Sequence, residues 1–454
     1  MSIATEAAPA QTDATGSYPR PAYAWYALGV ICFAYLFGFM DRIIVGLLTP
    51  AIQADLGLSD SQMGIIQGLA FALFYTLFGV PLGLAADRMN RKWLLTAGTT
   101  VWSLMTAVCG LARGFWPLFG ARVGVGIGEA TLNPCAASLI GDYFKPETRP
   151  KAFGVYTMST AFGTAVTYIT GGAVIAWVLG AGEGNTFPMP LLGDIQAWQA
   201  VFIIIGLAGL VPAILMALTV REPARQDLAK SQGAAADSAM TRNFLRRNRK
   251  TLLCHYFGVS LIIMAVYGWV NWMPTFFVRI HGWDVPTFSI YYGIFGGLTG
   301  IISAISSGFV TDWFKKRGRV DATMRTVLWG GLLLTIGTAI APLMPTPQLA
   351  LAGFVIAGLF ANYPSAQALA ALNEITPNQL RGLVTALYIL VLGLAGAGLG
   401  PFAMGWVTDN VFGDKQAIHY SMALVTGVMG LSGTALVAYG LKSFRESRAR
   451  VDWQ

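Results

Sequence analysis

Long apolar runs separated by short polar segments fill the chain from residue 23 onward. A helix that crosses a bilayer needs about 20 mostly apolar residues. Twelve runs meet that requirement: 23–51, 62–86, 93–112, 116–140, 152–179, 198–220, 252–278, 285–311, 325–345, 348–374, 382–408 and 420–441. The pattern therefore predicts an all-α membrane protein with twelve transmembrane helices in two sets of six.

The polar segments divide the chain into five parts. We expect a disordered cytoplasmic tail, an N-terminal six-helix half, a cytoplasmic basic linker, a C-terminal six-helix half and a second cytoplasmic tail, at 1–22, 23–220, 221–250, 251–442 and 443–454. The first residues lack the basic region and short apolar core of a cleaved signal peptide, so the first span is expected to be retained.

Composition agrees with a membrane protein, because only 11% of the 454 residues are charged, against roughly 25% in soluble domains. The net charge of +8 suggests nucleic-acid binding until the charges are placed along the chain. Of the 30 Lys and Arg residues, only Arg113, Arg279 and Lys415 fall in outer loops, and Arg42 and Arg122 lie within spans. Basic residues concentrate in cytoplasmic loops, so both termini are predicted to be cytoplasmic, with no nucleic-acid partner.

The short loops are typical of a multi-pass protein of a bacterial inner membrane. The run Arg242–Lys250 is either an interfacial helix on anionic lipid or simply part of this charge asymmetry. The four cysteines have no CxxC spacing, which favours reduced thiols over a metal site. No GxxxxGK[ST] loop or HExxH motif occurs, so we expect neither an enzyme nor a cofactor.

A repeat relates the two halves. The second span ends with Gly83 and Asp87 four residues apart before a basic cluster, and the eighth ends with Gly308 and Asp312 in the same arrangement. Related halves suggest a transporter with its substrate site between them. The segment Gly83 to Lys92 resembles the loop motif of the major facilitator superfamily, although Asn90 stands where that family usually has Gly.

The resemblance implies the major facilitator fold, with two six-helix halves related by pseudo-twofold symmetry. It also implies that Asp87 faces the start of the eleventh helix, where unpaired N–H groups attract a carboxylate. Such a contact holds the cytoplasmic side closed and favours an outward-open state. We therefore expect a gating set that consists of Asp87, Arg88, Arg91, Asp312 and Arg381.

Four charged residues lie inside two apolar runs, where an ionised side chain costs a few kcal/mol or more. Asp41 and Arg42 interrupt the first span, and Arg122 and Glu129 share one face of the fourth. Because these helices run in opposite directions, Asp41 falls in depth between Arg122 and Glu129. Two interpretations remain open: static ion pairs between helices, or a proton relay beside an anchor for a charged substrate.

Phe39 to Arg42, together with the segment from Gly124 to Pro134, is similar to the spinster-like branch of that superfamily. This resemblance implies that Asp41, Arg42 and Glu129 are the key cavity residues, and it makes proton coupling plausible. Eukaryotic spinsters are linked to the export of sphingolipids and lysophospholipids. Arg122 matches the basic residue of the fourth helix in the superfamily.

The second half contributes mainly aromatic and amide groups at mid-depth, which suit an amphipathic substrate with a charged head. The aromatic residues there are open to a second interpretation, plain helix packing. We expect Asp41 and Glu129 to couple protons, and we expect the substrate to contact Arg42, Arg122, Asn133, Tyr267, Asn271, Trp272, Asn362 and Tyr363.

The sequence thus predicts a monomeric, proton-coupled secondary transporter that moves an amphipathic or anionic organic molecule, such as a lysolipid, by alternating access. Export is slightly favoured over uptake. A second possibility is an organic-acid uptake symporter or a drug exporter of the same superfamily. A third is a non-transporting membrane receptor or scaffold, which would need neither the gating motif nor the intramembrane charges.

Overall fold

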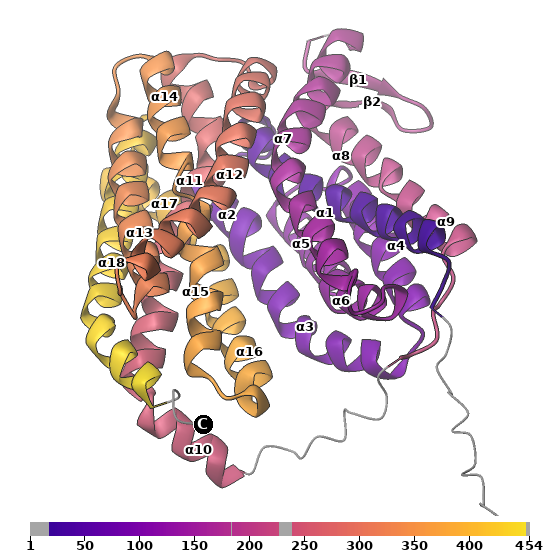
Figure 1. The fold of residues 1–454 in the computed structure, drawn as a ribbon. Helices are drawn as coiled ribbons and strands as arrows, with labels where there is room; N and C mark the ends of the chain where they lie inside the picture. Colours follow the sequence, from indigo (N-terminus) through magenta and orange to yellow (C-terminus); the bar gives the residue numbers. More distant parts are fainter. Residues whose placement is uncertain (1–17, 183, 227–237, 451–454) are drawn as a thin grey trace, which may run out of the picture.

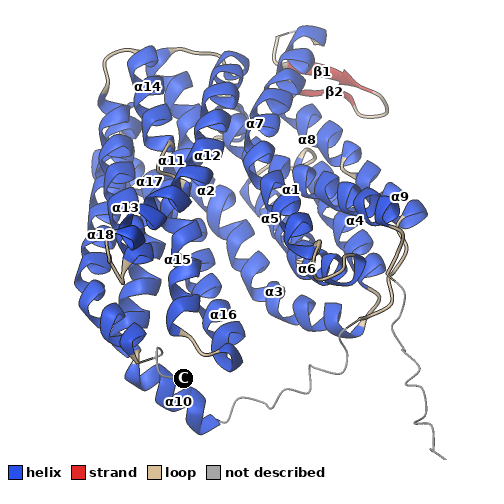
Figure 2. Cartoon of the chain, viewed as in Figure 1, coloured by secondary structure: helices blue, strands red, loops and turns tan. Residues whose placement is uncertain are grey.

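The computed structural model describes residues 18–182, 184–226 and 238–450. The predicted tail residues 1–17 and 451–454, and residues 227–237 of the predicted linker, lie outside this described part. Apart from one two-stranded hairpin, the regular elements in the described residues are helices (Figure 2).

The first half consists of α1 Pro21–Leu56, α2 Asp60–Gly64, η1 Ile65–Leu69, α3 Ala70–Arg88, α4 Arg91–Cys109, α5 Phe115–Glu129, α6 Leu132–Tyr143, α7 Arg149–Ala181, β1 Thr186–Met189, β2 Gly193–Gln196, α8 Ala197–Ala208 and α9 Leu210–Thr219. The second half, with the helix that precedes it, consists of α10 Ser238–Arg247, α11 Arg249–His281, α12 Val285–Lys316, α13 Ala322–Ile340, η2 Ala341–Leu343, α14 Pro347–Gly358, α15 Asn362–Ile375, η3 Asn378–Leu380, α16 Arg381–Val391, η4 Leu392–Gly398, α17 Leu399–Val407, η5 Thr408–Phe412, η6 Lys415–Ala417 and α18 Ile418–Ala449.

Helices or joined helix segments occupy all of the predicted apolar runs. In the described residues, 11 helices are long and apolar enough to cross a membrane. The run predicted as the third span corresponds to α4, which is not among these 11. Its 19 residues begin with Arg91 and Lys92 and include several Thr and Ser side chains, which lower its hydropathy.

The two halves stand side by side, the first in indigo to magenta and the second in orange to yellow (Figure 1). The hairpin of β1 and β2 lies at the top of this view, and α10 and the C-terminal end of α18 lie at the bottom. We call these ends of the molecule the hairpin side and the termini side.

Glycine residues let helices of the two halves approach closely. A Cβ added to Gly46 of α1 would lie 3.0 Å from the Asn271 carbonyl oxygen of α11. A Cβ on Gly68 of η1 would lie 2.3 Å from the Gly398 carbonyl oxygen of η4, and one on Gly64 would lie 2.6 Å from that of Pro401. These contacts form a glycine seam between η1, η4 and their neighbours, where no other side chain fits.

Both η1 and η4 are π-helical, and they contact each other across the two halves. A π-helical turn widens the backbone and is found most often at functional sites. Gly393, Gly396 and Gly398 supply flexibility in η4, because a residue without Cβ accommodates the irregular turn. At this point the two halves therefore contact each other through backbone atoms rather than through side chains.

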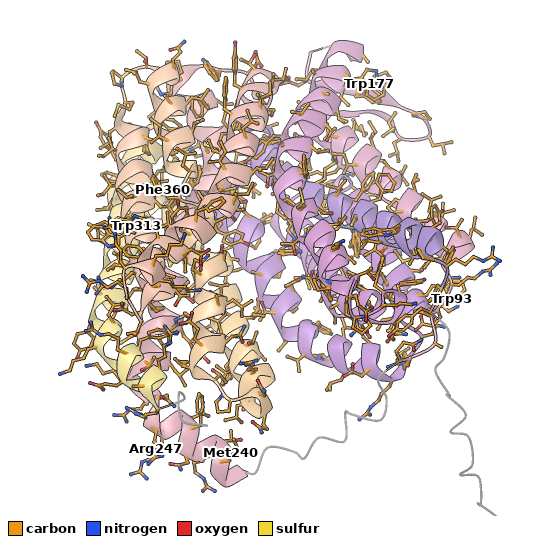
Figure 3. The ribbon with its side chains drawn as sticks, in the orientation of Figure 1. Trp93, Trp177, Met240, Arg247, Trp313 and Phe360 are labelled. Carbon is orange, nitrogen blue, oxygen red and sulfur yellow. The ribbon has the colours of Figure 1, made fainter. Side chains whose placement is uncertain are left out.

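The sequence did not predict the β-hairpin. Its strands pair in antiparallel register, with Thr186 opposite Gln196. Phe187 of β1 is buried against Trp177 of α7, with ring centroids 5.6 Å apart, and Trp177 marks this region in Figure 3. The turn contains Leu191 at a positive φ of 69°, a backbone conformation that β-propensity patterns do not reveal.

The basic linker contains the short helix α10. Phe244 and Leu245 pack against the core of the second half, while Arg242, Arg246 and Arg247 are exposed. Figure 3 shows Met240 and Arg247 on this helix at the termini side. Residues 242–247 of the run with two interpretations thus fold as a helix with an apolar face and a basic face, and Arg249 and Lys250 begin α11.

Candidate functional site

A cavity of about 230 Å³ lies between the two halves. From the first half it is lined by Arg42, Gln67, Gly68, Phe71, Ala72, Tyr75, Thr76 and Arg122. From the second half it is lined by Tyr267, Asn271, Ile389, Leu392, Gly393 and Ala397. Its charged groups therefore come from one half, and the other half adds an amide, a phenol and apolar surface.

Arg42 and Glu129 form an ion pair at the wall of this cavity. The Arg42 Nε and Nη2 atoms lie 2.7 and 2.6 Å from the same carboxylate oxygen, Oε2. The Glu129 side chain is fully buried, whereas 25% of the Arg42 side chain is exposed. The other carboxylate oxygen, Oε1, has no hydrogen-bond partner among the described residues. In this ion pair, Arg42 is thus accessible from the cavity, whereas Glu129 is buried behind it.

Local structure explains how Glu129 reaches this position. Glu129 is the last residue of α5, just before the break that separates α5 from α6. Its carboxyl group packs against Gly38 of α1, where an added Cβ would lie 3.4 Å from the carboxyl carbon. Gly126 of the same helix lies against the Phe71 backbone of α3. Small residues on both helices therefore bring the carboxylate to α1.

Arg122 and Asp41 are adjacent but interact differently. The Arg122 Nη1 atom donates to the backbone carbonyl oxygen of Asp41 at 3.0 Å. Both residues are buried, with exposures of 1% and 2%. The structure thus bonds Arg42 to Glu129 and Arg122 to the backbone of Asp41, both between α1 and α5.

Two aromatic rings of α3 hold the guanidinium groups. The Arg42 guanidinium carbon lies 4.8 Å from the centroid of Phe71 and 5.0 Å from that of Tyr75. The Arg122 guanidinium carbon lies 5.6 Å from the same Phe71 ring. Arginine is attracted to the face of an aromatic ring, so Phe71 positions both cations beside one cavity. Neither ring was among the residues expected from the sequence.

Asn133 lies next to this group rather than in the cavity wall. Its amide donates to the Tyr75 hydroxyl at 2.7 Å and accepts from the Tyr156 hydroxyl at 2.7 Å. The Tyr75 hydroxyl keeps its own hydrogen for another acceptor. Asn133 therefore orients Tyr75, and its expected contact with substrate stays a prediction.

The aromatic and amide residues of α11 divide between cavity and packing. Tyr267 and Asn271 line the cavity, and the Asn271 amide donates to the Tyr267 carbonyl oxygen at 2.8 Å. Trp272 is fully buried, and its indole donates to the Pro401 carbonyl oxygen at 2.8 Å. One residue further along a helix points about 100° away, which explains why Trp272 packs between helices instead.

Asn362 and Tyr363 are the first residues of α15, and they contact α12 and α13. The Asn362 amide donates to the Gly300 carbonyl oxygen at 3.1 Å, and the Tyr363 hydroxyl donates to Ser306 at 3.1 Å. Tyr363 also packs against Gly330 of α13. Neither residue lines the cavity in this structure, so their role in substrate binding remains a prediction.

The expected gating residues lie near the termini side in different settings. The side chains of Asp87 and Arg88 are exposed, and the Asp87 carbonyl oxygen accepts from Arg225. Asp312 is exposed beside Lys315, at 3.9 Å. Arg381 donates to the carbonyl oxygens of Thr376 and Asn373 in its own half.

Arg91 differs from the other gating residues, because it is 1% exposed and bonded on all sides. It pairs with Asp142 of α6 and with Glu222 beyond α9, at 2.6 Å for the latter. It also donates to the Ser138 hydroxyl and the Pro223 carbonyl oxygen. Arg91 thus joins three segments of the first half at the termini side.

On the hairpin side, polar contacts join the two halves. Arg279 of α11 donates to both carboxylate oxygens of Asp60, at 2.7 Å each, and to Gln53 at 2.5 Å. Asp409 accepts from the backbone N–H of Ser61 at 2.7 Å. Lys415 of the second half also donates to the Leu58 carbonyl oxygen at 3.4 Å on this side, and Tyr168 donates to the Val270 carbonyl oxygen at 3.5 Å.

Comparison with known proteins agrees with this arrangement. A family model described as the Major Facilitator Superfamily matches residues 31–324. The chain belongs to the major facilitator superfamily.

Several members of the superfamily are similar over most of the chain. An MFS-type efflux pump of Mycolicibacterium smegmatis is 26% identical over 435 residues, which cover 94% of each chain. Protein spinster homolog 1 of Homo sapiens is 24% identical, covering 90% of this chain and 79% of that protein. A hexuronate transporter of Bacillus subtilis is 26% identical, covering 84% and 88%.

The fold also matches solved structures. A bacterial homolog of the human lysosomal transporter spinster, in an inward-facing and occupied conformation, has a TM-score of 0.75 and 25% identity and covers 94% of this chain and 97% of that one. The spinster-like resemblance expected from the motifs of the first and fourth spans is confirmed. These relatives are transporters rather than enzymes, as the sequence predicts.

Proposed function

We propose that this member of the superfamily is a proton-coupled secondary transporter of an amphipathic or anionic organic molecule, and that it works by alternating access. The observation that carries this proposal is the ion pair of Arg42 and Glu129 at the wall of a cavity between the halves. A buried carboxylate paired to an accessible arginine is suited to exchange a proton for an anion.

The proposed coupling follows from charge balance. While Glu129 is ionised, it occupies the Arg42 guanidinium and lowers the attraction of that group for an anion. A proton on Glu129 removes its charge, so Arg42 can bind the substrate's anionic group instead. Asp41, beside Arg122, supplies a second carboxylate, which is proposed to carry a proton through the transport cycle without competing for the substrate. Static ion pairing is less consistent with this geometry, because Arg42 packs on Phe71 and Tyr75 and still leaves 25% of its side chain exposed at the cavity wall.

We further propose that the described conformation is inward-facing, with the termini side in the cytoplasm of a bacterial cell and the hairpin side outside. The hydrogen bonds of Arg279 to Asp60 and Gln53 close the hairpin side. The glycine seam lies beside them. Opening to the outside then requires these contacts to break, while Asp87 approaches the start of the eleventh span on the termini side.

The proposal includes α4 as a twelfth span and a monomer as the working unit. Each half has a core of its own, a third core joins the two halves, and the cavity between them is lined by residues of this one chain. The basic face of α10 is proposed to contact anionic lipid headgroups in the inner leaflet. A passive receptor or scaffold remains the rival class, and it would need neither the buried charges nor the polar closure.

Two substrate classes fit the proposed site. A lysolipid suits the apolar lining from Ile389, Leu392 and Ala397, whereas a sugar acid suits the two arginines alone. The relatives include proteins named for spinster and for hexuronate transport, so both classes are kept. Export is proposed for the lysolipid, in exchange for protons, and uptake with protons for the sugar acid.

Flux into proteoliposomes tests the proposal. Full-length protein is reconstituted, and the movement of labelled lysophosphatidic acid and of labelled glucuronate is measured with and without an imposed pH gradient. Gradient-stimulated flux of either compound supports the proposal. Flux of neither compound under any gradient, in vesicles that contain correctly folded protein, contradicts it.

A further inference from the structure

A glutamine at the cavity wall has an unpaired acceptor. Gln67 lies in η1, the π-helical turn beside the glycine seam, and lines the cavity together with Arg42 and Arg122. The residue is 6% exposed. Its carbonyl oxygen Oε1 has no hydrogen-bond partner among the described residues. A buried polar atom without a partner is unusual in a native structure and calls for an explanation.

The hydrogen-bond network fixes which end of this amide is unpaired. The Thr49 hydroxyl donates its single hydrogen to the Val45 carbonyl oxygen at 2.8 Å. Thr49 can therefore only accept from Gln67, and the 2.6 Å contact between them must involve the amide nitrogen Nε2. The carbonyl oxygen is thus the end left free. A reversed amide would place two acceptors against each other.

The charged neighbours supply the opposite kind of group. Guanidinium groups donate hydrogen bonds and never accept them. The Arg122 Nε atom has no partner within the described part of the chain. The residues that line the cavity therefore include one unsatisfied donor, Arg122 Nε, and one unsatisfied acceptor, Gln67 Oε1, both buried just beneath its surface. A ligand that satisfies both carries an anionic group and, next to it, a hydrogen-bond donor.

The electrostatic setting selects among possible donors. Two cations, Arg42 and Arg122, line the same cavity. A positively charged donor on the ligand, such as an ammonium group, would be repelled by them. A neutral hydroxyl donates to the Gln67 carbonyl oxygen without that cost. The required chemistry is an anion with a neighbouring hydroxyl, which occurs in sugar acids and in lysophospholipid headgroups.

We propose that Gln67 is a specificity-determining residue that accepts a hydrogen bond from a substrate hydroxyl next to the anionic group bound by Arg42 and Arg122. This inference rests on the proposed function and narrows its substrate class. Analogues that lack the hydroxyl leave the Gln67 acceptor unpaired, so the site binds them at least roughly tenfold more weakly.

Binding to the purified full-length protein in detergent tests the inference by calorimetry with two matched pairs. One pair is glucuronate and cyclohexanecarboxylate, and the other is lysophosphatidic acid and its 2-deoxy analogue. The pair that shows the preference tells whether the anionic group belongs to a sugar acid or to a lysophospholipid headgroup. Gln67→Met removes the acceptor with little change in shape.

In the wild type, the hydroxylated member of at least one pair is expected to bind roughly tenfold tighter or more. Gln67→Met should abolish this preference by weakening the hydroxylated member alone. Gln367→Leu is the matched control, because Gln367 donates to Ser307 at 3.3 Å outside the cavity lining. It should leave the preference intact.

An unchanged preference in Gln67→Met overturns the inference. Equal wild-type binding of both members of each pair also overturns it, but leaves the proposed anion transport standing. Binding of no member of either pair contradicts both the inference and the proposed function.

Discussion

Arg279 reaches across from the second half and donates one hydrogen bond to each carboxylate oxygen of Asp60 in the first half, at 2.7 Å each. The Asp60 side chain is fully buried. The two residues are 219 positions apart in the chain, and they meet where the hairpin side is closed.

Asp60→Asn should shift the protein toward a state open on the hairpin side. Removing one partner of a buried ion pair leaves the other charge uncompensated, at about 3–5 kcal/mol, and this loss applies only to the closed state. Distances between spin labels on the α1–α2 and α17–α18 loops should lengthen in a larger share of molecules. Asp321→Asn, which breaks a pair with Arg325 within one half, is the control and should leave these distances unchanged.

Asp87→Asn should shift the same equilibrium in the opposite direction. The Asp87 side chain is exposed here and is predicted to meet the start of the eleventh span only when the termini side closes. Its neutralisation therefore removes a contact of the outward-facing state alone. Between the same spin labels, a larger share of molecules should show the short distance of the state that is closed on the hairpin side. A shift toward longer distances would contradict the predicted role of Asp87.

Glu129→Gln should free Arg42 and raise the affinity for an anionic substrate roughly tenfold, because a full charge no longer competes for the guanidinium. In the wild type, lowering the pH protonates Glu129 and has the same effect, so affinity should rise as the pH falls. In the variant, this pH dependence should be lost.

Binding isotherms across the pH range measure this prediction. The control is Glu374→Gln, because Glu374 pairs with Arg448 at 3.5 Å within the second half. The control should keep the wild-type pH dependence. A wild-type pH profile in Glu129→Gln would show that Glu129 does not carry the coupling.

Asp41→Asn should uncouple transport from the pH gradient and leave substrate affinity within about threefold of the wild type. Arg122 bonds to the backbone carbonyl oxygen of residue 41, so this hydrogen bond survives the substitution. Only the carboxylate charge is lost. Flux into proteoliposomes should become insensitive to the gradient. Equal flux of variant and wild type at every gradient would exclude Asp41 from coupling.

Arg42→Lys should weaken anion binding about tenfold although the positive charge is kept. Lysine has a compact ammonium that neither forms a planar fork nor stacks on Phe71 and Tyr75 as the guanidinium does. Calorimetry with the preferred ligand measures the change. Arg325→Lys, in an ion pair away from the cavity, is the control. An unchanged affinity in Arg42→Lys would remove the proposed anchor role.

The sequence predicted the helices because membrane spans require long apolar runs, and the buried charges stood out for the same reason. Depth along two antiparallel helices placed Asp41 between Arg122 and Glu129. The expectation that these residues share one cavity came from the resemblance to the superfamily, and the structure bonds Arg42 to Glu129 and Arg122 to the backbone of Asp41.

Other parts of the site could not be read from the pattern. Gln67 interrupts an apolar run, which is a usable signal, but its unpaired oxygen depends on the Thr49 hydroxyl of another helix. Asp60 and Arg279 lie at span ends, where charges are common, so their pairing appears only in three dimensions. Asn271 and Trp272 are neighbours in sequence, but Asn271 lines the cavity and Trp272 packs between helices. Only the rotation of the helix about its axis decides which residue faces the cavity.

The glycine seam has an electrical consequence. Where Gly68 meets Gly398 there is no room for even a methyl group, so the two backbones are in direct contact. In the proposed inward-facing state, most of the membrane voltage then falls across this seam instead of along the cavity. Each elementary charge that crosses it exchanges about 2.3 kcal/mol with a potential of 100 mV. The step that opens the seam, rather than substrate binding, is therefore the one at which membrane voltage acts on transport.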